Sequence, residues 1–450
     1  MKYAFVLGRL PALSVAEILA VMEKLEIKYQ IKTVSPKTLV LDIEKEIDFK
    51  RILKTIGGTV KIMKLGRFPE EFSDIQNIIK HLALEKANQL NNKIIIGYSV
   101  YSTDKTEKNK FNQISKSIKK KLIALKKELK KEGIACRIIT PKDYEMELSS
   151  ASIINNKILE KGIDLNFIIT SSRPLFHERE DIELALGKTV AIQDIESYKQ
   201  RDYERPCREA KIGMMPPKLA QIMLNLAQVK EGQLILDPFC GTGVILQEAL
   251  LMGCRIIGSD FNEKQVQNTK TNLEWLKENY LSDQFPSREE LEMGFPIGST
   301  HPQPPPERGL QILKIDAMHL AKKINPLSVD AIITETTLGP IYTKPPVPKE
   351  IRKNFKKLEK VYLKFLTQAK KVLKPDARIV MAVPCYQTRS GKFTLMPIVD
   401  IFKKTGYSVK EPVPKDILAK LGPTPNITAR NTLIYSRRDQ MVGREIIVLE

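Results

Sequence analysis

The feature that most constrains the fold is a short glycine-containing segment in the second half of the chain. It reads Asp237-Pro-Phe-Cys-Gly241-Thr-Gly243 and follows the apolar segment 233–237, which is typical of a strand. A helix is expected directly after it, over 242–252. The glycines let the backbone turn tightly and come close to a ligand, and the helix N-terminus offers free N–H groups. This order predicts a ligand site at the end of a parallel strand.

The remainder of this half alternates strands and helices. We expect strands at 233–237, 255–260, 311–316, 329–335 and 377–384, and helices near 242–252, 263–278, 349–373 and 394–404. This alternation predicts a doubly wound, Rossmann-like α/β domain. The segments 432–436 and 444–449 are expected to form an antiparallel hairpin that closes the sheet. The proline-rich segment 283–309 is expected to be a long loop.

The first half of the chain contains two smaller α/β units. In residues 1–66, strands are expected at 2–7, 29–34, 38–42 and 59–64, and helices at 14–24 and 48–56. This β-α-β-β-α-β order predicts a ferredoxin-like domain, and Ser14 and Glu17 have the spacing of a capping box that would begin the first helix. A second unit is expected over 67–194, with strands at 93–98, 135–139 and 165–169. Residues 195–215 have the composition of a linker, and 216–450 form the C-terminal domain.

The chain carries a formal net charge of +20, which indicates a polyanionic partner. Nucleic acid is the first candidate and an anionic membrane surface is the second. Residues 105–131 alone hold eleven lysines and two glutamates, and the apolar residues of the expected helix 109–131 recur at helical spacing. The basic face is either a solvated surface or a contact for RNA or DNA. The side chains expected to contact RNA are Lys119, Lys120, Lys126, Lys130, Arg201 and Arg205.

The five cysteines and four histidines are scattered without the spacing of a metal site. We therefore expect no structural metal, and sparse thiols suit a reducing, cytoplasmic compartment. The N-terminal segment lacks the apolar core of a signal peptide, and no apolar stretch of about twenty residues predicts a membrane span.

Acidic residues stand at the ends of three successive expected strands. Asp237 precedes the glycines, Asp260 ends the next strand, and Asp316 ends the third. An acid before the glycine loop suits the cationic S-adenosyl-L-methionine, and an acid about twenty residues later suits a ribose diol. Asp316 and the N–H of Ala317 could bind adenine. A nicotinamide dinucleotide is disfavoured because Leu246 occupies the third glycine position of its motif. The expected cofactor-binding residues are Asp237, Phe239, Gly241, Gly243, Asp260, Phe261, Asp316 and Ala317.

The fourth strand ends in Glu335-Thr-Thr-Leu338-Gly339-Pro340, where a catalytic loop is expected. Methyltransferases that act on amino groups usually carry Asp/Asn-Pro-Pro-Tyr/Phe here, which holds the amino group in line with the methyl donor and stacks on a flipped base. Glu335 can accept from the amino group, and Tyr342 is a candidate for stacking. The candidate catalytic residues are Glu335, Leu338, Gly339 and Pro340.

These motifs resemble those of the THUMP-containing tRNA guanine-N2 methyltransferases of archaeal and eukaryotic type, which act on the guanine at position ten. The resemblance covers most of the chain. It rests on Tyr3–Gly8, Leu13–Glu17, Leu148–Ala151, Arg201–Pro206, Gly213–Ala220, Asp237–Gly243, Asp260, Asn272–Trp275 and Tyr435–Glu445. The loop Glu335–Leu338 departs from the family, which has Asp-Pro-Pro-Tyr there.

The resemblance implies a cytoplasmic enzyme that methylates tRNA or another structured RNA, with a THUMP-like middle unit that grips the RNA. The acceptor, by the same resemblance, is guanine N2, although the divergent loop leaves another base amino group, or no transfer, open. The two rival interpretations are a DNA amino-methyltransferase and an RNA-binding protein with a vestigial cofactor site. A requirement for a small activator subunit, the oligomeric state and the number of methyl groups transferred stay open.

Overall fold

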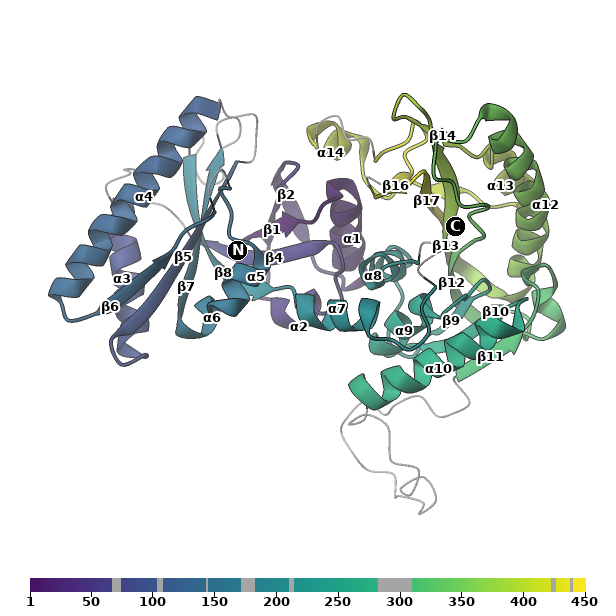
Figure 1. Ribbon diagram of the computed structural model, residues 1–450, viewed down its shortest axis with the longest axis horizontal. Coiled ribbons are helices and arrows are strands. Elements are labelled where there is room, and N and C mark those ends of the chain that lie inside the picture. Colours follow the sequence, from purple (N-terminus) through teal and green to yellow (C-terminus); the bar gives the residue numbers. More distant parts are fainter. Residues whose placement is uncertain are drawn as a thin grey trace, which may run out of the picture.

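The computed structural model describes residues 1–66, 74–102, 108–142, 145–170, 183–209, 214–281, 310–421, 426–437 and 440–450. The molecule is elongated, with the first unit of the chain between the lysine-rich helix at one end and the C-terminal half at the other (Figure 1). The expected loop 283–309 lies outside the described residues.

The first 66 residues form the expected β-α-β-β-α-β unit. Its elements are β1 (Lys2–Leu7), α1 (Pro11–Lys24), β2 (Tyr29–Val34), β3 (Thr38–Ile43), α2 (Phe49–Leu53) and β4 (Thr59–Gly66). The strands pair antiparallel in the order β2-β3-β1-β4, because β1 binds both β3 and β4. Helix α1 is buried along almost its whole length.

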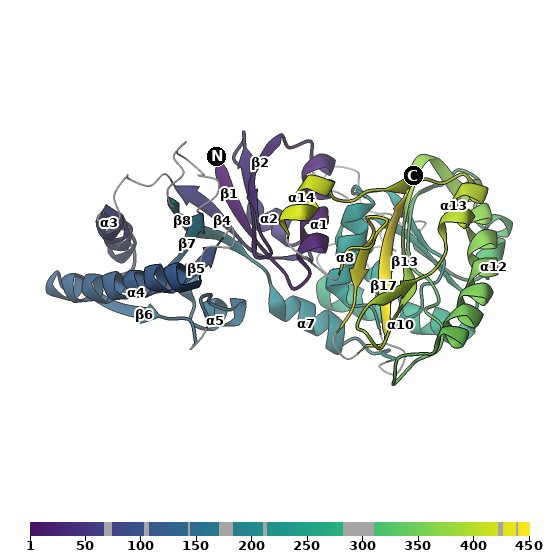
Figure 2. The same ribbon diagram turned by 90° about the horizontal axis from the view of Figure 1, so that it is seen from above.

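The second unit continues the same sheet. Its elements are α3 (Asp74–Asn88), β5 (Lys93–Ser102), α4 (Lys108–Lys131), β6 (Ala135–Ile139), α5 (Ser150–Asn155), α6 (Ile158–Lys161), β7 (Gly162–Thr170) and β8 (Glu183–Ile192). Strand β8 pairs antiparallel with β4, so one sheet runs in the order β2-β3-β1-β4-β8-β7-β5-β6 through both units. The sequence did not lead us to expect α3 or β8. Helices α3 and α4 pack on β5 and β7, and β6 is the edge strand (Figure 2).

The prediction that Ser14 and Glu17 form a capping box is wrong. Helix α1 begins at Pro11, and both side chains are buried inside it. Ser14 Oγ donates to the carbonyl of Gly58 (2.7 Å), and Glu17 accepts from the backbone N–H groups of Gly57 (2.8 Å) and Gly58 (2.7 Å). The two polar residues therefore bind the loop before β4 rather than the helix N-terminus.

The expected linker also contains a helix. Residues 195–203 form α7 (Ile195–Tyr203), which begins where Asp194 accepts from the N–H of Ser197 (3.1 Å). Helix α7 leads to the C-terminal half, whose first helix, α8 (Pro217–Leu226), packs against α1. Asn225 of α8 donates to Glu17 of α1 (2.8 Å), and one apolar core spans both helices. The two halves are thus joined by a continuous core.

The C-terminal half is the expected doubly wound domain. Its strands are β9 (Leu234–Asp237), β10 (Arg255–Asp260), β11 (Leu310–Lys314), β12 (Val329–Glu335), β13 (Leu373–Gln387), β14 (Phe393–Leu395), β15 (Val409–Lys410), β16 (Leu433–Tyr435) and β17 (Val442–Leu449). Its further helices are α9 (Val244–Leu251), α10 (Glu263–Tyr280), η3 (Ala317–Lys322), α12 (Pro348–Val372), α13 (Val399–Thr405) and α14 (Lys415–Lys420).

Strands β11, β10, β9, β12 and β13 are parallel, and β17 enters antiparallel between β13 and β15. Neighbouring residues along a strand face opposite layers. Ile235 packs with α8, α9 and α10, whereas Leu236 packs with η3, α12 and α13. The expected terminal hairpin is present, because β16 pairs antiparallel with β17. The strand order reverses between β9 and β12, which creates the crevice where such sheets bind ligands.

Candidate cofactor and catalytic site

The carboxyl ends of β9, β10 and β12 bring the expected acids to one edge of the sheet. Asp237 ends β9, Asp260 ends β10 and Glu335 ends β12. β9 lies between β10 and β12, so its last residue stands at the reversal of strand order. The sequence order of the strands alone did not fix these neighbours.

Asp237 is the most buried of these acids, with 2% of its surface exposed. Its Oδ1 accepts hydrogen bonds from Thr334 Oγ1 (2.7 Å) and from the N–H of Phe239 (3.2 Å). The pKa of Asp237 is raised to about 7, mainly by burial; the nearby carboxylates of Asp260 and Glu335 act in the same direction, and the two hydrogen bonds oppose the rise. A cationic ligand at this point would relieve that electrostatic cost.

The glycine loop is held from helix α10. Gly243 has φ +81°, and a Cβ there would lie 2.8 Å from Thr269 Cγ2. Thr269 Oγ1 donates to the carbonyl of Gly241 (2.7 Å), and Asn272 Nδ2 donates to the carbonyl of Thr242 (2.8 Å). The loop is therefore fixed with its backbone close to α10, and only glycine fits at 243. Asn272 belongs to a matched sequence motif, but its contact with this loop emerges only in the fold.

Asp260 binds the same loop. Its Oδ2 accepts from the N–H of Gly241 (3.2 Å) and its Oδ1 from the N–H of Asn262 (2.9 Å). Burial raises the pKa of Asp260 above the usual range, and the backbone N–H groups counteract that rise. The next residue, Phe261, is 70% exposed, which leaves its ring available for a ligand.

The remaining expected cofactor residues have local structural roles as well. Asp316 accepts from the N–H of Met318 (2.9 Å) and so caps η3, and Ala317 is buried beneath it. Phe239 packs edge-on against Phe365 of α12, with ring centroids 5.3 Å apart. The cofactor contacts of these residues stay predictions.

Two tyrosines form hydrogen bonds with the candidate catalytic loop. Thr336 Oγ1 is hydrogen-bonded to Tyr362 OH (2.6 Å), and Tyr386 OH donates to the carbonyl of Leu338 (3.1 Å). Gly339 has φ +85°, and a Cβ there would lie 2.7 Å from Tyr386 OH. The loop is therefore closely supported, and its conformation requires glycine at 339.

Tyr342, the candidate for stacking, packs edge-on against Tyr386 (5.8 Å between centroids) and accepts from Asn354 Nδ2 (2.7 Å). Pro340 is exposed on the loop.

Glu335 has an ionic partner that the sequence reasoning missed. Its carboxylate forms an ion pair with Arg444 of β17, whose side chain is 2% exposed against 21% for Glu335. Arg444 lies in the matched tail segment, which was the available signal, but the pairing across 109 residues depends on the antiparallel insertion of β17. The buried guanidinium fixes the carboxylate at the sheet edge through a charge-assisted hydrogen bond.

The expectation that Arg201 and Arg205 contact RNA is not met. Arg201 forms a buried ion pair with Glu248 of α9 (2.7 Å), and its guanidinium lies over the Tyr198 ring. Arg205 is also buried, near the sulfur of Met214. Arg201 thus joins α7 to α9 of the C-terminal domain, and both arginines are buried rather than presented on the surface.

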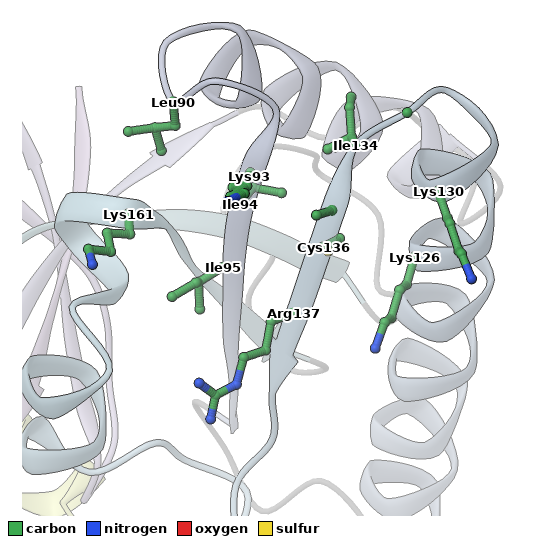
Figure 3. A pocket seen from close by; sticks show the side chains of 12 residues that line it. Leu90, Lys93, Ile94, Ile95, Lys126, Lys130, Ile134, Cys136, Arg137 and Lys161 are labelled. Atoms are coloured by element: carbon green, nitrogen blue, oxygen red, sulfur yellow. The ribbon is translucent and has the colours of Figure 1, made fainter.

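The four lysines expected to bind RNA are exposed on α4. Lys126 and Lys130 also line an open groove of about 900 Å³ beside the edge strand β6. Lys161 lines it from the opposite side, and Lys93, Arg137 and an apolar floor that includes Ile94 and Ile134 lie between (Figure 3). The lining holds five cations and no acidic side chain. Lys119 and Lys120 are exposed further along the helix.

Among the described residues, no cluster of three or more His, Cys, Asp or Glu side chains could hold a metal ion. No helix of the described part is both long and apolar enough to span a bilayer.

Comparisons with known proteins agree with this geometry. Residues 205–288 match the model of a family described as an RMKL-like methyltransferase domain. The chain is 33% identical over 226 residues to the tRNA (guanine(10)-N2)-dimethyltransferase of Methanothermobacter thermautotrophicus, which covers 50% of this chain and 53% of that enzyme. It is 33% identical over 162 residues to the enzyme of the same name from Methanocaldococcus jannaschii, covering 34% and 38%.

The chain therefore spans about half or less of the length of these curated relatives. Among solved structures, TrmN from Thermus thermophilus aligns with 100% of this chain and 99% of its own, at 14% identity and a TM-score of 0.49. The expected resemblance to tRNA guanine-N2 methyltransferases is confirmed by the sequence relatives, and the α/β fold is confirmed. The THUMP likeness of the middle unit stays a prediction.

Proposed function

We propose that this protein transfers a methyl group from S-adenosylmethionine to an exocyclic amino group of a tRNA base, with guanine N2 as the acceptor. The observation that carries the proposal is the edge of the parallel sheet. There the buried Asp237, the loop-bound Asp260 and the paired Glu335 end neighbouring strands. The sequence relatives named tRNA (guanine(10)-N2)-dimethyltransferase support both the reaction and the substrate.

The residues present fit the cofactor. An acidic, desolvated Asp237 suits a ligand with a sulfonium and an ammonium group, and open space beside Gly241 leaves room for a ligand to approach the backbone closely. Asp260 would accept hydrogen bonds from the ribose hydroxyls, and the exposed Phe261 ring would lie against the adenine. Asp316 and Ala317 would bind the polar edge of the adenine. The cofactor supplies an electrophilic methyl group when bound.

Glu335 has the chemistry to orient the acceptor. Its carboxylate would accept a hydrogen bond from the guanine amino group, so that the nitrogen lone pair points toward the methyl carbon. When bound, the cofactor would supply the methyl group that this nitrogen accepts in exchange for the S–C bond, and the nitrogen would release a proton to solvent. Arg444 would hold the Glu335 carboxylate in one orientation through the ion pair. The 21% exposure of Glu335 leaves part of the carboxylate accessible from the sheet edge.

The N-terminal half would hold the RNA. The groove beside β6 has a cationic lining and an apolar floor, which suits a phosphate backbone with unstacked bases. The exposed Lys119 and Lys120 extend the basic surface along α4. A folded tRNA is long enough to contact both halves of an elongated protein.

The direct test is a nucleoside mass spectrum of unmodified tRNA incubated with the protein and S-adenosylmethionine. We expect N2-methylated guanosine with the wild-type protein and none with Asp237→Ala. Methylation at a different base amino group would retain the enzyme class and change the acceptor. Transfer to duplex DNA but not to tRNA would support the DNA amino-methyltransferase instead.

A second function, RNA binding without catalysis, is favoured by one observation. Glu335 already has a charged partner in Arg444, and the loop lacks the prolines and the aromatic residue typical of active relatives of this class. Under this alternative the protein would bind tRNA and S-adenosylmethionine, as measured by calorimetry, and would leave tRNA unmodified in a single-turnover assay.

A further inference from the structure

A group of basic and aromatic side chains lies where the two halves of the protein meet. It consists of Arg9 from the turn after β1, Tyr203 and Arg208 around the end of α7, and Tyr435 and Arg437 from the C-terminal hairpin. We call these five residues the junction rim. Three segments that are far apart in the sequence contribute to it, so composition and spacing gave no signal for it.

The contacts on the hairpin side connect the rim to the catalytic loop. Arg9 Nη2 donates to the carbonyl of Ser436 (2.8 Å), and the Arg9 guanidinium lies 5.6 Å from the centre of the Tyr435 ring. The guanidinium of Arg444 lies 5.9 Å from the centre of the same ring. Tyr435 therefore contacts both a residue of the first unit and the partner of Glu335.

The contacts on the α7 side connect the rim to the cofactor loop. Arg208 donates to the carbonyl of Tyr203 (3.3 Å) and stacks 5.0 Å from its ring centre, while the Tyr203 ring is 61% exposed. The adjacent Cys207 exchanges hydrogen bonds with Asn272, which in turn binds the carbonyl of Thr242 in the glycine loop.

Arg437 lies between the hairpin side and the α7 side of the junction rim. Its guanidinium lies near the side chains of Tyr435, Tyr203 and Asp202. Asp202 offsets part of the positive charge, and Arg9, Arg208 and Arg437 remain exposed. In the strand register Tyr435 stands opposite Arg444, which places the rim at the same edge of the sheet as Glu335.

We propose that the junction rim binds the RNA backbone and a base immediately beside the nucleotide that enters the catalytic site. This inference rests on the proposed function and assigns it a second RNA contact, separate from α4 and the groove beside β6. Arginine guanidinium groups bind phosphate oxygens through paired hydrogen bonds, and an exposed tyrosine ring offers a stacking surface for any base. Extrusion of a base requires the flanking nucleotides to be held, and the rim borders the edge where the extruded base would arrive.

The experiment compares the full-length wild type with the triple variant Arg9→Ala/Arg208→Ala/Arg437→Ala. The matched control is Lys356→Ala/Lys360→Ala/Lys364→Ala, which removes the same charge from the exposed side of α12. Affinity for unmodified tRNA is measured between 50 and 200 mM salt. Loss of three phosphate contacts lowers the slope of log affinity against log salt by about 2. The ratio of wild-type to rim-variant affinity for tRNA should therefore fall about 20-fold between 50 and 200 mM salt. The control variant is expected to keep a slope closer to that of the wild type.

Folding and the cofactor site provide the internal checks. We expect the rim variant to keep the wild-type unfolding temperature and affinity for S-adenosylmethionine. The charge-conserving variant Arg9→Lys/Arg208→Lys/Arg437→Lys should recover most of the salt slope, which a purely structural role of these arginines would not require. Tyr203→Ala should lower tRNA affinity without changing the slope, because stacking releases no counterions.

The possible failures are distinguishable. A wild-type protein that neither binds nor methylates tRNA would overturn the proposed function and the rim together. If the wild type binds and methylates tRNA while the rim variant has an unchanged slope and KM, the rim proposal alone is wrong. An equal loss of slope in the α12 control would also refute it, because general surface charge would then explain the effect.

Discussion

The affinity for S-adenosylmethionine should depend on pH through Asp237. In the cofactor-free protein, burial raises the pKa of this carboxyl to about 7, so it is mostly protonated and neutral at pH 6. A cationic cofactor interacts favourably with the ionised form only. Binding at pH 6 should therefore release about one proton, and the affinity should increase as the pH rises.

The size of the pH effect on cofactor affinity follows from the shift in the pKa of Asp237. The ordinary pKa of an aspartate is 3.8, and the raised value is about 7. Affinity should increase by about ten-fold per pH unit between about pH 5 and 7, and become constant above that. The same pKa shift lowers the stability of the folded protein as the pH rises, which is opposite in sign to its effect on cofactor affinity. Because the folded pKa exceeds the unfolded pKa, the stabilisation present below about pH 4 is lost as the pH rises through 7, by about 4 kcal/mol.

Isothermal titration calorimetry in two buffers of different ionisation enthalpy measures the released proton directly. Asp237→Asn should bind more weakly at pH 8 and show neither proton release nor pH dependence. Glu17→Gln is the matched control, because burial also raises the pKa of Glu17 to about 7, at the α1–α8 junction. This variant should change the pH dependence of stability and leave that of cofactor binding intact. A wild-type affinity that is constant from pH 5 to 7 would refute the reasoning.

Three further variants test the remaining assignments. Glu335→Gln should retain cofactor affinity and lower the single-turnover rate on tRNA by roughly ten- to a thousand-fold, whereas equal rates would assign Glu335 to structure. Arg201→Met should reduce the free energy of unfolding in urea by about 3–5 kcal/mol by leaving Glu248 unpaired, with unchanged tRNA affinity of the folded protein; selective loss of tRNA binding would contradict this. Lys126→Ala/Lys130→Ala should lower the salt slope of tRNA binding by about 1.4, and an unchanged slope would exclude the groove beside β6.

The sequence by itself determined the local elements of the site. Apolar strands followed by acids and by the 241–243 glycines predicted the order β9, loop, α9, and placed Asp237 and Asp260 at strand ends. These features depend on neighbours within a few residues, where periodicity and glycine chemistry are informative. The terminal hairpin was predictable for the same reason.

Residues whose role depends on distant partners were assigned less well. Ser14 and Glu17 have the spacing of a capping box, yet their partners are Gly57, Gly58 and Asn225. A polar side chain in a helix can satisfy its hydrogen bonds locally or across a packed interface, and spacing alone does not distinguish the two. Arg201 likewise had the charge of an RNA contact, but it is buried against Glu248.

Only the tertiary structure decided how the two halves combine. β8 joins both N-terminal units in one sheet, α1 and α8 share a core, and Arg444 reaches Glu335 because β17 enters beside β13. Each of these contacts joins segments that are far apart in the chain. Their free energy comes from burial and pairing that exist only after the chain has folded, so local sequence patterns carry no record of which partner is chosen.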